Sequence, residues 1–405
     1  MNIGLLHYAA PPVVGGVESV LGQHARLMAD AGHRVTILAG RGGQTDPRIN
    51  FRLVPLMDSR HPEILAVKAQ LDAGQVPALF YDLVARLREV LTQSLMGMDV
   101  IIAHNIGSLN KNLALTSALK ETFDPARRPA LILWHHDLAW TTPRYQPELH
   151  AGEPWDNLRT AWPGAIQVTI SEERRTELVE LFKLPAAQIQ VIPNGVDLTQ
   201  FLKLSQETQK YIHALDLNLA DPLLLMPVRI TPRKNIELAL RTLARLRPRF
   251  PQVRLLVTGP LGPHNPANAQ YFEMLVALRA ELGLNGSAHF LAELTDEFIP
   301  DEVIADLYRL ADALFLPSFE EGFGIPILEA GLAGLPVFCS DIPQLQALGG
   351  RFATTFSPEA DPQAVADLIG DRLEHEPISG MRRLVKMEYT WQRIFKEKIE
   401  PLLRA

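Results

Sequence analysis

Two glutamates, Glu321 and Glu329, flank a glycine-rich turn in the stretch SFEEGFGIPILEAGLAGLPV (residues 318–337). Carboxylates accept paired hydrogen bonds from vicinal hydroxyl groups. The run ADALFLP just before them (residues 311–317) is apolar and has the length of a buried strand. We therefore expect the two side chains to hold two hydroxyl-bearing parts of one ligand, such as the two sugars of a nucleotide sugar.

A helix is predicted to begin directly after the glycine turn. Pro326 is typical of a first helical turn, and Gly334 is typical of a helix end. Glu329 would then lie about one turn inside the helix. The backbone N–H groups of the turn are expected to face the same space as the carboxylates, and they belong to Gly322, Phe323 and Gly324.

Two cations follow another predicted strand, in PVRITPRKNIELAL (residues 227–240). Arg229 leaves the strand end, and Lys234 comes just before Asn235, a residue type that favours helix caps. Cations beside a helix N-terminus suit a diphosphate. The alternative is a solvated basic loop, and the loop taken alone favours that alternative.

A glycine pair, Gly15–Gly16, precedes a helix predicted to begin near Val17. Glycines let backbone N–H groups approach an anion, which the helix dipole also favours. A tight turn between strand and helix explains the pair equally well. The spacing does not match the G-x-G-x-x-G of dinucleotide sites, and no Gly-Lys pair occurs, which excludes a Walker-type phosphate loop.

Polar residues also end two predicted strands of the first half. His135, His136 and Asp137 follow one strand, and Asn105 follows another. A strand-end histidine can donate to an oxyanion or a hydroxyl, and a neighbouring carboxylate can fix its tautomer. Adjacent histidines on an extended chain point in different directions, so they are a poor metal pair. Structural packing is the alternative.

Apolar runs separated by helix-like stretches recur along the chain, which is the pattern of parallel sheets covered by helices. The turn signal Pro193–Gly195 separates two sets and is predicted to be a hinge. Residues 389–403 are predicted to be a final amphipathic helix. Strands are predicted at residues 2–8, 33–40, 99–104, 130–135, 165–170 and 189–192, and then at 223–228, 253–259, 288–293, 311–317 and 336–341.

This pattern predicts an α/β protein of two doubly wound, Rossmann-like domains that divide at residue 193. In such sheets ligands bind beyond the carboxyl ends of the strands. The polar candidates above all lie in loops of that kind.

The composition sets limits on the class of protein. A chain of 405 residues is long for one core, and 47% hydrophobic with 21% charged residues is ordinary for a globular protein. The net charge is −7 and the basic residues are spread along the chain, which argues against nucleic acid as the main partner. The single cysteine, Cys339, leaves no intramolecular disulfide and no cysteine metal cluster.

The sequence also carries a prediction about localisation. The start MNIGLLHYAAPPVV lacks the basic flank and long apolar region of a signal peptide. No apolar run approaches the ~18 residues of a membrane helix. We therefore expect a cytoplasmic protein whose contact with a membrane is at most peripheral. The oligomeric state has no signature in the sequence.

The stretch EGFGIPILE resembles the E-x7-E motif of the retaining GT-B glycosyltransferases, chiefly family 4. GGVE, WHHD, VTISEERRTEL, VIPNGVDLTQF, VRITPRKN and YTWQRI follow in the order of that family along nearly the whole chain. Three features depart from the pattern. The glycine before the strand-end arginine is Val228 here, a frequent glutamate after CSDIP is Ala347, and residues 258–272 form a longer, more proline-rich loop.

The resemblance implies an acceptor-side N-terminal domain of residues 1–192 and 388–405, a donor-binding C-terminal domain of residues 193–387, a cleft that the two domains face, and a role for each candidate. Arg229 and Lys234 would bind the donor diphosphate, Glu329 the ribose hydroxyls, and Glu321 the transferred sugar. The implied catalytic residues are His136, Glu321, Arg229 and Lys234; the donor-binding residues are Gly15, Gly16, Gly322, Phe323, Gly324 and Glu329; the acceptor residues are Asn105, His135 and Asp137.

The implied reaction moves a hexose from a nucleotide-diphosphate sugar to an acceptor hydroxyl with retained anomeric configuration. No protein nucleophile is evident, and the chain has no Asp-x-Asp, so no metal or other cofactor is expected. Two alternatives stay open. One is another GT-B sugar-nucleotide enzyme, an epimerase or a phosphorylase; the other is a sugar-binding homologue without catalysis.

Overall fold

The chain divides into two compact units in the computed structural model, which describes residues 1–260 and 266–404. We call Met1–Gly195 with Trp391–Ala405 the N-terminal unit and Val196–Thr390 the C-terminal unit. The chain passes from one unit to the other at two positions, and each lies a few residues after the position expected from the sequence. Part of the proline-rich loop noted above lies outside the described residues.

A parallel seven-stranded sheet forms the centre of the N-terminal unit, in the order β3-β2-β1-β4-β5-β6-β7. Its interior strands are buried on both faces and therefore read as continuous apolar runs, which is why the sequence pattern predicts them. Only β3, a mostly exposed edge strand, has no such run and is not predicted. The strands are β1 (Asn2–His7), β2 (Arg34–Ala39), β3 (Asn50–Leu53), β4 (Val100–His104), β5 (Ala130–His135), β6 (Ile166–Thr169) and β7 (Ile189–Val191).

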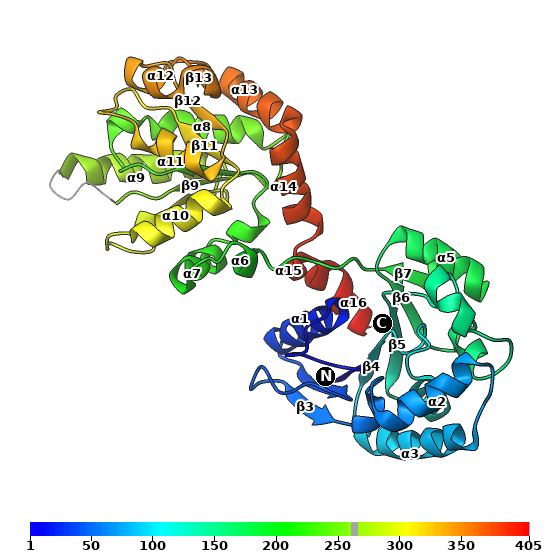
Figure 1. Ribbon diagram of the computed structural model, residues 1–405. Helices are drawn as coiled ribbons and strands as arrows, with labels where there is room; N and C mark the ends of the chain where they lie inside the picture. Colours follow the sequence, from blue (N-terminus) through cyan, green and yellow to red (C-terminus); the bar gives the residue numbers. More distant parts are fainter. Residues whose placement is uncertain (261–265, 405) are drawn as a thin grey trace. The chain divides into compact units, whose positions relative to one another are not determined.

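Alternate residues of these strands enter two different hydrophobic clusters, as expected when side chains point to opposite faces of a sheet. On β4, Ile101 and Ala103 belong to one cluster, and Val100 and Ile102 to the other. Figure 1 shows helices on both sides of the sheet. The helices are α1 (Gly16–Asp30), α2 (Pro62–Asp72), α3 (Ala78–Ser94), α4 (Leu113–Thr122) and α5 (Glu172–Phe182), with short 3-10 turns η1 (Pro55–Met57), η2 (Pro143–Glu148), η3 (Trp155–Leu158) and η4 (Ala186–Gln188).

The C-terminal segment returns to the N-terminal unit, where it packs on the cluster that also holds the buried side of α1. It is helical throughout, as the sequence predicts, but its middle has π-helical hydrogen bonding. The parts are α15 (Trp391–Ile394), the π segment η9 (Phe395–Ile399) and α16 (Glu400–Arg404). Trp391, Ile399 and Leu403 are among its buried residues.

A second parallel sheet forms the C-terminal unit, in the order β10-β9-β8-β11-β12-β13. Each segment predicted to be a strand in this unit contains one. In one of these segments, however, residues 291–293 form the 3-10 turn η7 (Leu291–Glu293). The edge strand β13 is not predicted because it has only one buried residue. The strands are β8 (Leu223–Met226), β9 (Arg254–Val257), β10 (Ala288–Phe290), β11 (Ala313–Leu316), β12 (Val337–Ser340) and β13 (Ala353–Phe356).

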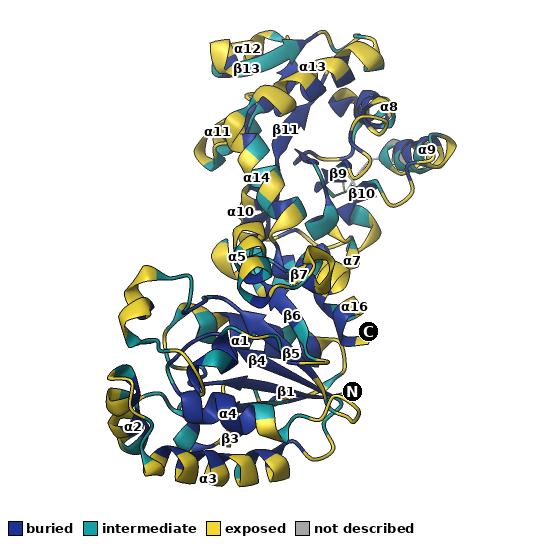
Figure 2. Ribbon diagram, turned by 90° about the vertical axis from the view of Figure 1, so that its right-hand side faces the viewer, coloured by how far each residue is buried: buried dark blue, intermediate teal, exposed yellow. Residues whose placement is uncertain are grey.

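Helices also flank this second sheet, and Figure 2 shows its interior strands dark blue between helices with exposed outer faces. The segments are α6 (Leu198–Phe201), α7 (Gln206–Ala214), α8 (Ile236–Leu246), α9 (Pro266–Glu281), α10 (Asp301–Leu310), α11 (Ile325–Ala333), α12 (Pro343–Gly349), α13 (Pro362–His375) and α14 (Pro377–Glu388), with 3-10 turns η5 (Leu217–Leu219), η6 (Pro232–Lys234) and η8 (Gly350–Phe352).

Both sheets have the strand order of a Rossmann fold, so the first strand of each lies between its second and fourth strands. The order reverses between β1 and β4 in one sheet and between β8 and β11 in the other. Open α/β sheets bind ligands at the carboxyl ends of the strands beside such a reversal. The loops after β8 and β11 are therefore the first place to look in the C-terminal unit.

One local prediction is wrong. The sequence signal at Pro193–Gly195 indicates a turn, but these residues form neither a hydrogen-bonded turn nor a bend. The hinge predicted there stays a prediction. The glycine is required there for another reason, because a Cβ on Gly195 would lie 2.8 Å from the ring of Trp391. Among the helices of the described residues, none is both long enough and apolar enough to cross a membrane.

Candidate active site

The loops after β8 and β11 bring two predicted site residues into contact. Lys234 ends η6 in the first loop, and Glu321 lies in the second loop. Lys234 Nζ donates to Glu321 Oε1 at 2.6 Å, and each side chain is only 8% exposed. Ser318 Oγ donates to the same carboxylate oxygen at 2.7 Å. The reversal of strand order thus joins a cation and a carboxylate that are 87 positions apart in sequence.

Backbone contacts fasten these loops together. Phe319 N donates to the carbonyl of Arg233 at 2.8 Å. Asn235 takes the N-cap position of α8, but its side chain does not cap the helix and instead donates to the Pro358 carbonyl at 2.9 Å. The prediction that Asn235 caps α8 is therefore wrong. Its left-handed backbone, with φ of 51°, turns the side chain away from the first helical N–H groups.

Arg229 leaves β8 in the same loop and is exposed, with no hydrogen bond or ion pair among the described residues. Its neighbour Val228 is buried in the core and presents its carbonyl to Gly259. A Cβ at Gly259 would lie 2.0 Å from that carbonyl oxygen, so only glycine fits there. No role for Gly259 was predicted from the sequence. The signal was a glycine at the end of the strand predicted at residues 253–259, which marks a close approach of two backbones.

In the turn before α11, the backbone and its neighbours require glycine at one position but not at the other. Gly324 is the N-cap of α11 with φ of 99°, and a Cβ there would lie 2.8 Å from the side chain of Leu345. Gly322 is exposed, and its Cβ position has no neighbour within 4 Å. In the described part of the chain, the N–H groups of Gly322 and Phe323 have no acceptor, so both can donate to a ligand.

Glu329 lies on α11, one turn after its start, as predicted. It is not hydrogen-bonded to Lys234 or Glu321. Instead its Oε2 accepts a hydrogen bond of 2.6 Å from the hydroxyl of Tyr308 on α10. Sequence reasoning missed Tyr308, because nothing local in the helix α10 distinguishes a tyrosine that packs from one that donates to another helix.

The glycine pair of the N-terminal unit lies at the start of α1. Gly15 is its N-cap in an extended conformation, and Gly16 is exposed with open space at its Cβ position. The carboxylate of Glu18 folds back over Gly15, since a Cβ there would be 2.0 Å from Glu18 Oε2. A negative group is favourable at a helix N-terminus. An anionic ligand at this position therefore requires Glu18 to move.

Asn105 shapes the loop that carries the strand-end histidines. It has a left-handed backbone with φ of 57° and is buried. Its Oδ1 accepts hydrogen bonds from the backbone N–H groups of His136, at 2.8 Å, and Asp137, at 3.2 Å. This oxygen is thus used to hold the loop. The predicted contact of Asn105 with an acceptor stays a prediction, for which the amide nitrogen is the remaining donor.

The two adjacent histidines point to different partners, as expected on an extended chain. His135 Nε2 lies 2.8 Å from Gln167 Oε1, and His136 Nε2 lies 3.0 Å from His104 Nδ1. Burial lowers the pKa of His135 to about 4 and that of His136 to about 3, so both rings are neutral at pH 7. Direct contact between His135 and an acceptor would require its buried ring to leave Gln167.

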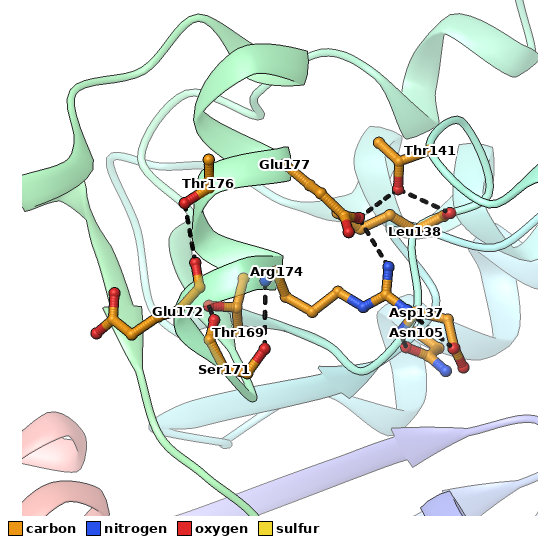
Figure 3. Close-up of polar contacts among 10 residues, drawn as sticks. All are labelled: Asn105, Asp137, Leu138, Thr141, Thr169, Ser171, Glu172, Arg174, Thr176 and Glu177. Carbon is orange, nitrogen blue, oxygen red and sulfur yellow. Dashed lines mark hydrogen bonds and ion pairs between the residues drawn. The ribbon is translucent and has the colours of Figure 1, made fainter.

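Asp137 is the more accessible member of the predicted acceptor set, and Figure 3 shows it beside Arg174. Arg174 Nη2 lies 4.0 Å from Asp137 Oδ1, while Nη1 donates to Glu177 Oε2 at 2.7 Å. Thr141 Oγ1 donates to the same glutamate oxygen at 2.5 Å. The start of α5 and the loop after β5 are thus joined by one polar network. Arg174 lies in the segment VTISEERRTEL, and no role for it was predicted from the sequence.

No group of three or more histidine, cysteine, aspartate or glutamate side chains is arranged to hold a metal ion within the residues that the structure describes. Three cations lie in the loop after β8. Arg229 and Arg233 are exposed, and Lys234 is paired with a carboxylate.

Two family models match the chain, one for each unit. Residues 14–200 match the model described as Glycosyltransferase Family 4, and residues 207–389 match the model described as Glycosyl transferases group 1. The matches follow one another without overlap and together leave out only the two ends and a short junction.

Several curated proteins are similar to the chain. An MMP alpha-(1->4)-mannosyltransferase of Mycolicibacterium hassiacum is 25% identical, over 98% of this chain and 97% of its own length. A D-inositol 3-phosphate glycosyltransferase of Streptosporangium roseum is 26% identical, over 90% of this chain and 81% of its length. A protein of the same name from Nocardia farcinica is 31% identical, but the match covers 51% of this chain and 45% of that protein.

Two solved structures align along the chain. An Anabaena protein in complex with UDP and glucose has a TM-score of 0.39 with 20% identity and covers 100% of both chains. A sucrose-phosphate synthase of Thermosynechococcus elongatus has a TM-score of 0.37 with 20% identity, over 100% of this chain and 98% of that one.

Proposed function

Because this chain belongs to the family 4 glycosyltransferases and has two Rossmann-like units, we propose that it is a retaining hexosyltransferase that uses a nucleoside-diphosphate sugar. The observation that carries the proposal is the contact between Lys234 and Glu321 at the strand-order reversal of the C-terminal unit, with Arg229 exposed in the same loop. The mannosyltransferase among the relatives supports a hexose as the transferred sugar.

The pair suits the junction between phosphate and sugar in such a donor. In a nucleoside-diphosphate sugar the anomeric carbon is bonded directly to the second phosphate, so a cation for the phosphate and an acceptor for sugar hydroxyls must lie side by side. Lys234 and Glu321 lie side by side in this way, 2.6 Å apart. Arg229 would add a second cation for the diphosphate, and the free N–H groups of Gly322 and Phe323 would donate to sugar oxygens.

The proposed chemistry breaks the bond between the anomeric carbon and the phosphate oxygen. The acceptor hydroxyl attacks that carbon from the face of the leaving group, so the new glycosidic bond has the configuration of the old one. The proton of the hydroxyl passes to the departing phosphate oxygen. Arg229 and Lys234 stabilise the negative charge that develops on the diphosphate, which is the contribution a metal ion makes in other enzymes.

The N-terminal unit would supply the acceptor side of the reaction. Asp137 is the candidate for contact with the acceptor hydroxyl, because Asn105 and His135 are occupied by contacts within the unit. His136 is proposed to donate to the donor sugar, and Gly16 to lie near the phosphates once Glu18 has moved. The glycosyltransferase is proposed to need no metal.

Nucleotide calorimetry tests the proposal on the C-terminal site. UDP, GDP and ADP are titrated into the wild type with magnesium and with EDTA, and the nucleotide that binds is then titrated into Arg229→Ala. We expect one nucleotide to bind equally well in EDTA, and the variant to bind it about tenfold more weakly or worse, because a charge-assisted hydrogen bond is lost.

Arg233→Ala is the matched control. Arg233 is an exposed arginine of the same loop, and only its backbone carbonyl is used in the contact with Phe319. Its replacement removes one positive charge without removing a proposed ligand. The affinity for the nucleotide is therefore expected to stay within about twofold of the wild-type value. Equal losses in both variants would show general electrostatic attraction only. If none of the three nucleotides binds the wild type, the assignment of the donor site is wrong.

A further inference from the structure

Glu329, the proposed ligand of the ribose, is held by a residue of another helix. The Tyr308 hydroxyl on α10 donates to Glu329 Oε2 at 2.6 Å. Tyr308 itself is 3% exposed, and its hydroxyl also lies 3.4 Å from the carbonyl of Pro326 in the first turn of α11. A buried, well-packed ring therefore fixes the position of one carboxylate oxygen.

The surroundings offer Glu329 no other partner. Its side chain lines a groove of about 510 Å³ between α10 and α11, which is otherwise mostly apolar. The one basic side chain lining this groove is Arg309, which donates to Asp306 and to the Leu202 carbonyl. Within the described residues, Tyr308 is thus the only group hydrogen-bonded to the Glu329 side chain. Without it, a half-exposed glutamate would rotate about three single bonds.

The tyrosine can act on a ligand only through the glutamate. Burial and the neighbouring Glu329 carboxylate raise the pKa of Tyr308 far above its ordinary value, so the hydroxyl keeps its proton. A phenol has one proton to donate. That proton is given to Oε2, and the remaining lone pairs of the carboxylate are free to accept from other donors.

From this geometry we infer that Tyr308 is a positioning residue of the nucleotide site. Its hydroxyl holds the Glu329 carboxylate in the orientation that accepts hydrogen bonds from the vicinal hydroxyls of a ribose. The inference rests on the proposed function, in which Glu329 binds the ribose. The gain comes from ordering the carboxylate before the ligand arrives, which removes a cost that binding otherwise carries.

A thermodynamic cycle between the tyrosine hydroxyl and a ribose hydroxyl tests the inference. The nucleoside diphosphate that binds the wild type and its 2′-deoxy form are both titrated into wild type, Tyr308→Phe and Glu329→Gln. We expect Tyr308→Phe to weaken the ribonucleotide about threefold to tenfold and to leave the deoxynucleotide nearly unchanged. The ratio of the two affinities, ribonucleotide over deoxynucleotide, would thus be smaller in Tyr308→Phe than in wild type, and smaller still in Glu329→Gln.

Tyr271→Phe is the matched control, because the Tyr271 hydroxyl donates to a glutamate, Glu237, elsewhere in the same unit. It removes the same kind of bond and is expected to keep the full preference for ribose. Thermal unfolding of the variants identifies any loss of fold.

The outcomes separate the two claims. If Tyr308→Phe weakens both nucleotides equally, or neither, the hydroxyl has only a packing role and the inference is wrong, while the proposed function stands. If the wild type binds no nucleoside diphosphate, the proposed donor site fails and the ribose role of Tyr308 fails with it.

Discussion

Lys234 Nζ lies 2.6 Å from Glu321 Oε1, and both side chains are almost completely buried at the carboxyl ends of β8 and β11. Ser318 provides the carboxylate with a second donor. A buried pair of opposite charges is costly to break, because the partner left behind keeps its charge without compensation. This contact therefore links the chemistry proposed for the site to the stability of the loops that build it.

Replacing Lys234 by methionine should destabilise the C-terminal unit and should also weaken binding of the donor. We expect the free energy of unfolding to fall by about 3 kcal/mol, since Glu321 would remain buried and unpaired. The double variant Lys234→Met with Glu321→Gln should lose less than the sum of the single variants. Urea unfolding of the four proteins measures this coupling. Lys210→Met removes an equally short but exposed pair with Glu207 and should change little, so an equal loss there would contradict the argument.

The two glycines of the turn before α11 should respond differently to alanine. Gly324→Ala places a Cβ in a left-handed backbone and 2.8 Å from Leu345, so we expect a loss of about 1–3 kcal/mol in unfolding free energy. Gly322→Ala meets open space in an exposed turn and should stay within about 0.5 kcal/mol of wild type. Thermal and urea unfolding compare the variants. Equal losses would show that the turn rearranges as a whole.

His24 should make the stability of the N-terminal unit fall in mild acid. It is fully buried, its ring nitrogens have no hydrogen-bond partner in the described chain, and burial lowers its pKa to about 3. The unfolded chain takes up a proton near pH 6.5 while the folded one does not, so the stability present above that pH is lost as the pH falls. From pH 7.5 to 5.5 this amounts to about 1.4 kcal/mol.

Urea unfolding of wild type and His24→Leu at the two pH values measures this contribution. The variant should lose about 1.4 kcal/mol less than wild type over the interval, whereas replacement of the exposed His213 by alanine should keep the wild-type dependence. Identical pH dependence in wild type and His24→Leu would show that the buried ring is protonated in the folded state. The His24 ring is in contact with the rings of Trp134, His104 and Trp391.

The tautomer of His136 should be set by His104. Their nitrogens lie 3.0 Å apart, and His104 Nε2 is buried without a partner. A buried N–H without an acceptor is rarer than a buried lone pair without a donor. His104 should therefore donate from Nδ1, which leaves His136 with its proton on Nδ1. Long-range ¹⁵N–¹H spectra of histidine-labelled protein at pH 7 report the tautomer, with His136→Gln for assignment. A neutral His136 protonated on Nε2 would contradict the argument.

The sequence by itself determined the elements and the order of the candidate residues. Parallel strands covered on both faces are continuous apolar runs, so the interior strands of both sheets could be predicted. The edge strands β3 and β13, which have at most one buried residue each, could not. Proline and glycine placed the start and end of α11, and with them Glu329 one turn inside the helix. These signals are local, because backbone propensity and periodicity depend on residues a few positions apart.

Only the tertiary structure decided which of these groups meet. The contact of Lys234 with Glu321 spans 87 positions, and that of Tyr308 with Glu329 joins two helices, so no local pattern contains either. The direction of the Asn235 side chain followed from a left-handed backbone that its residue type permits but does not require. The glycine at 259 is required by the Val228 carbonyl in the loop after β8. The contact of Lys234 with Glu321 arises where the strand order reverses, between β8 and β11, and that reversal is a property of the folded sheet.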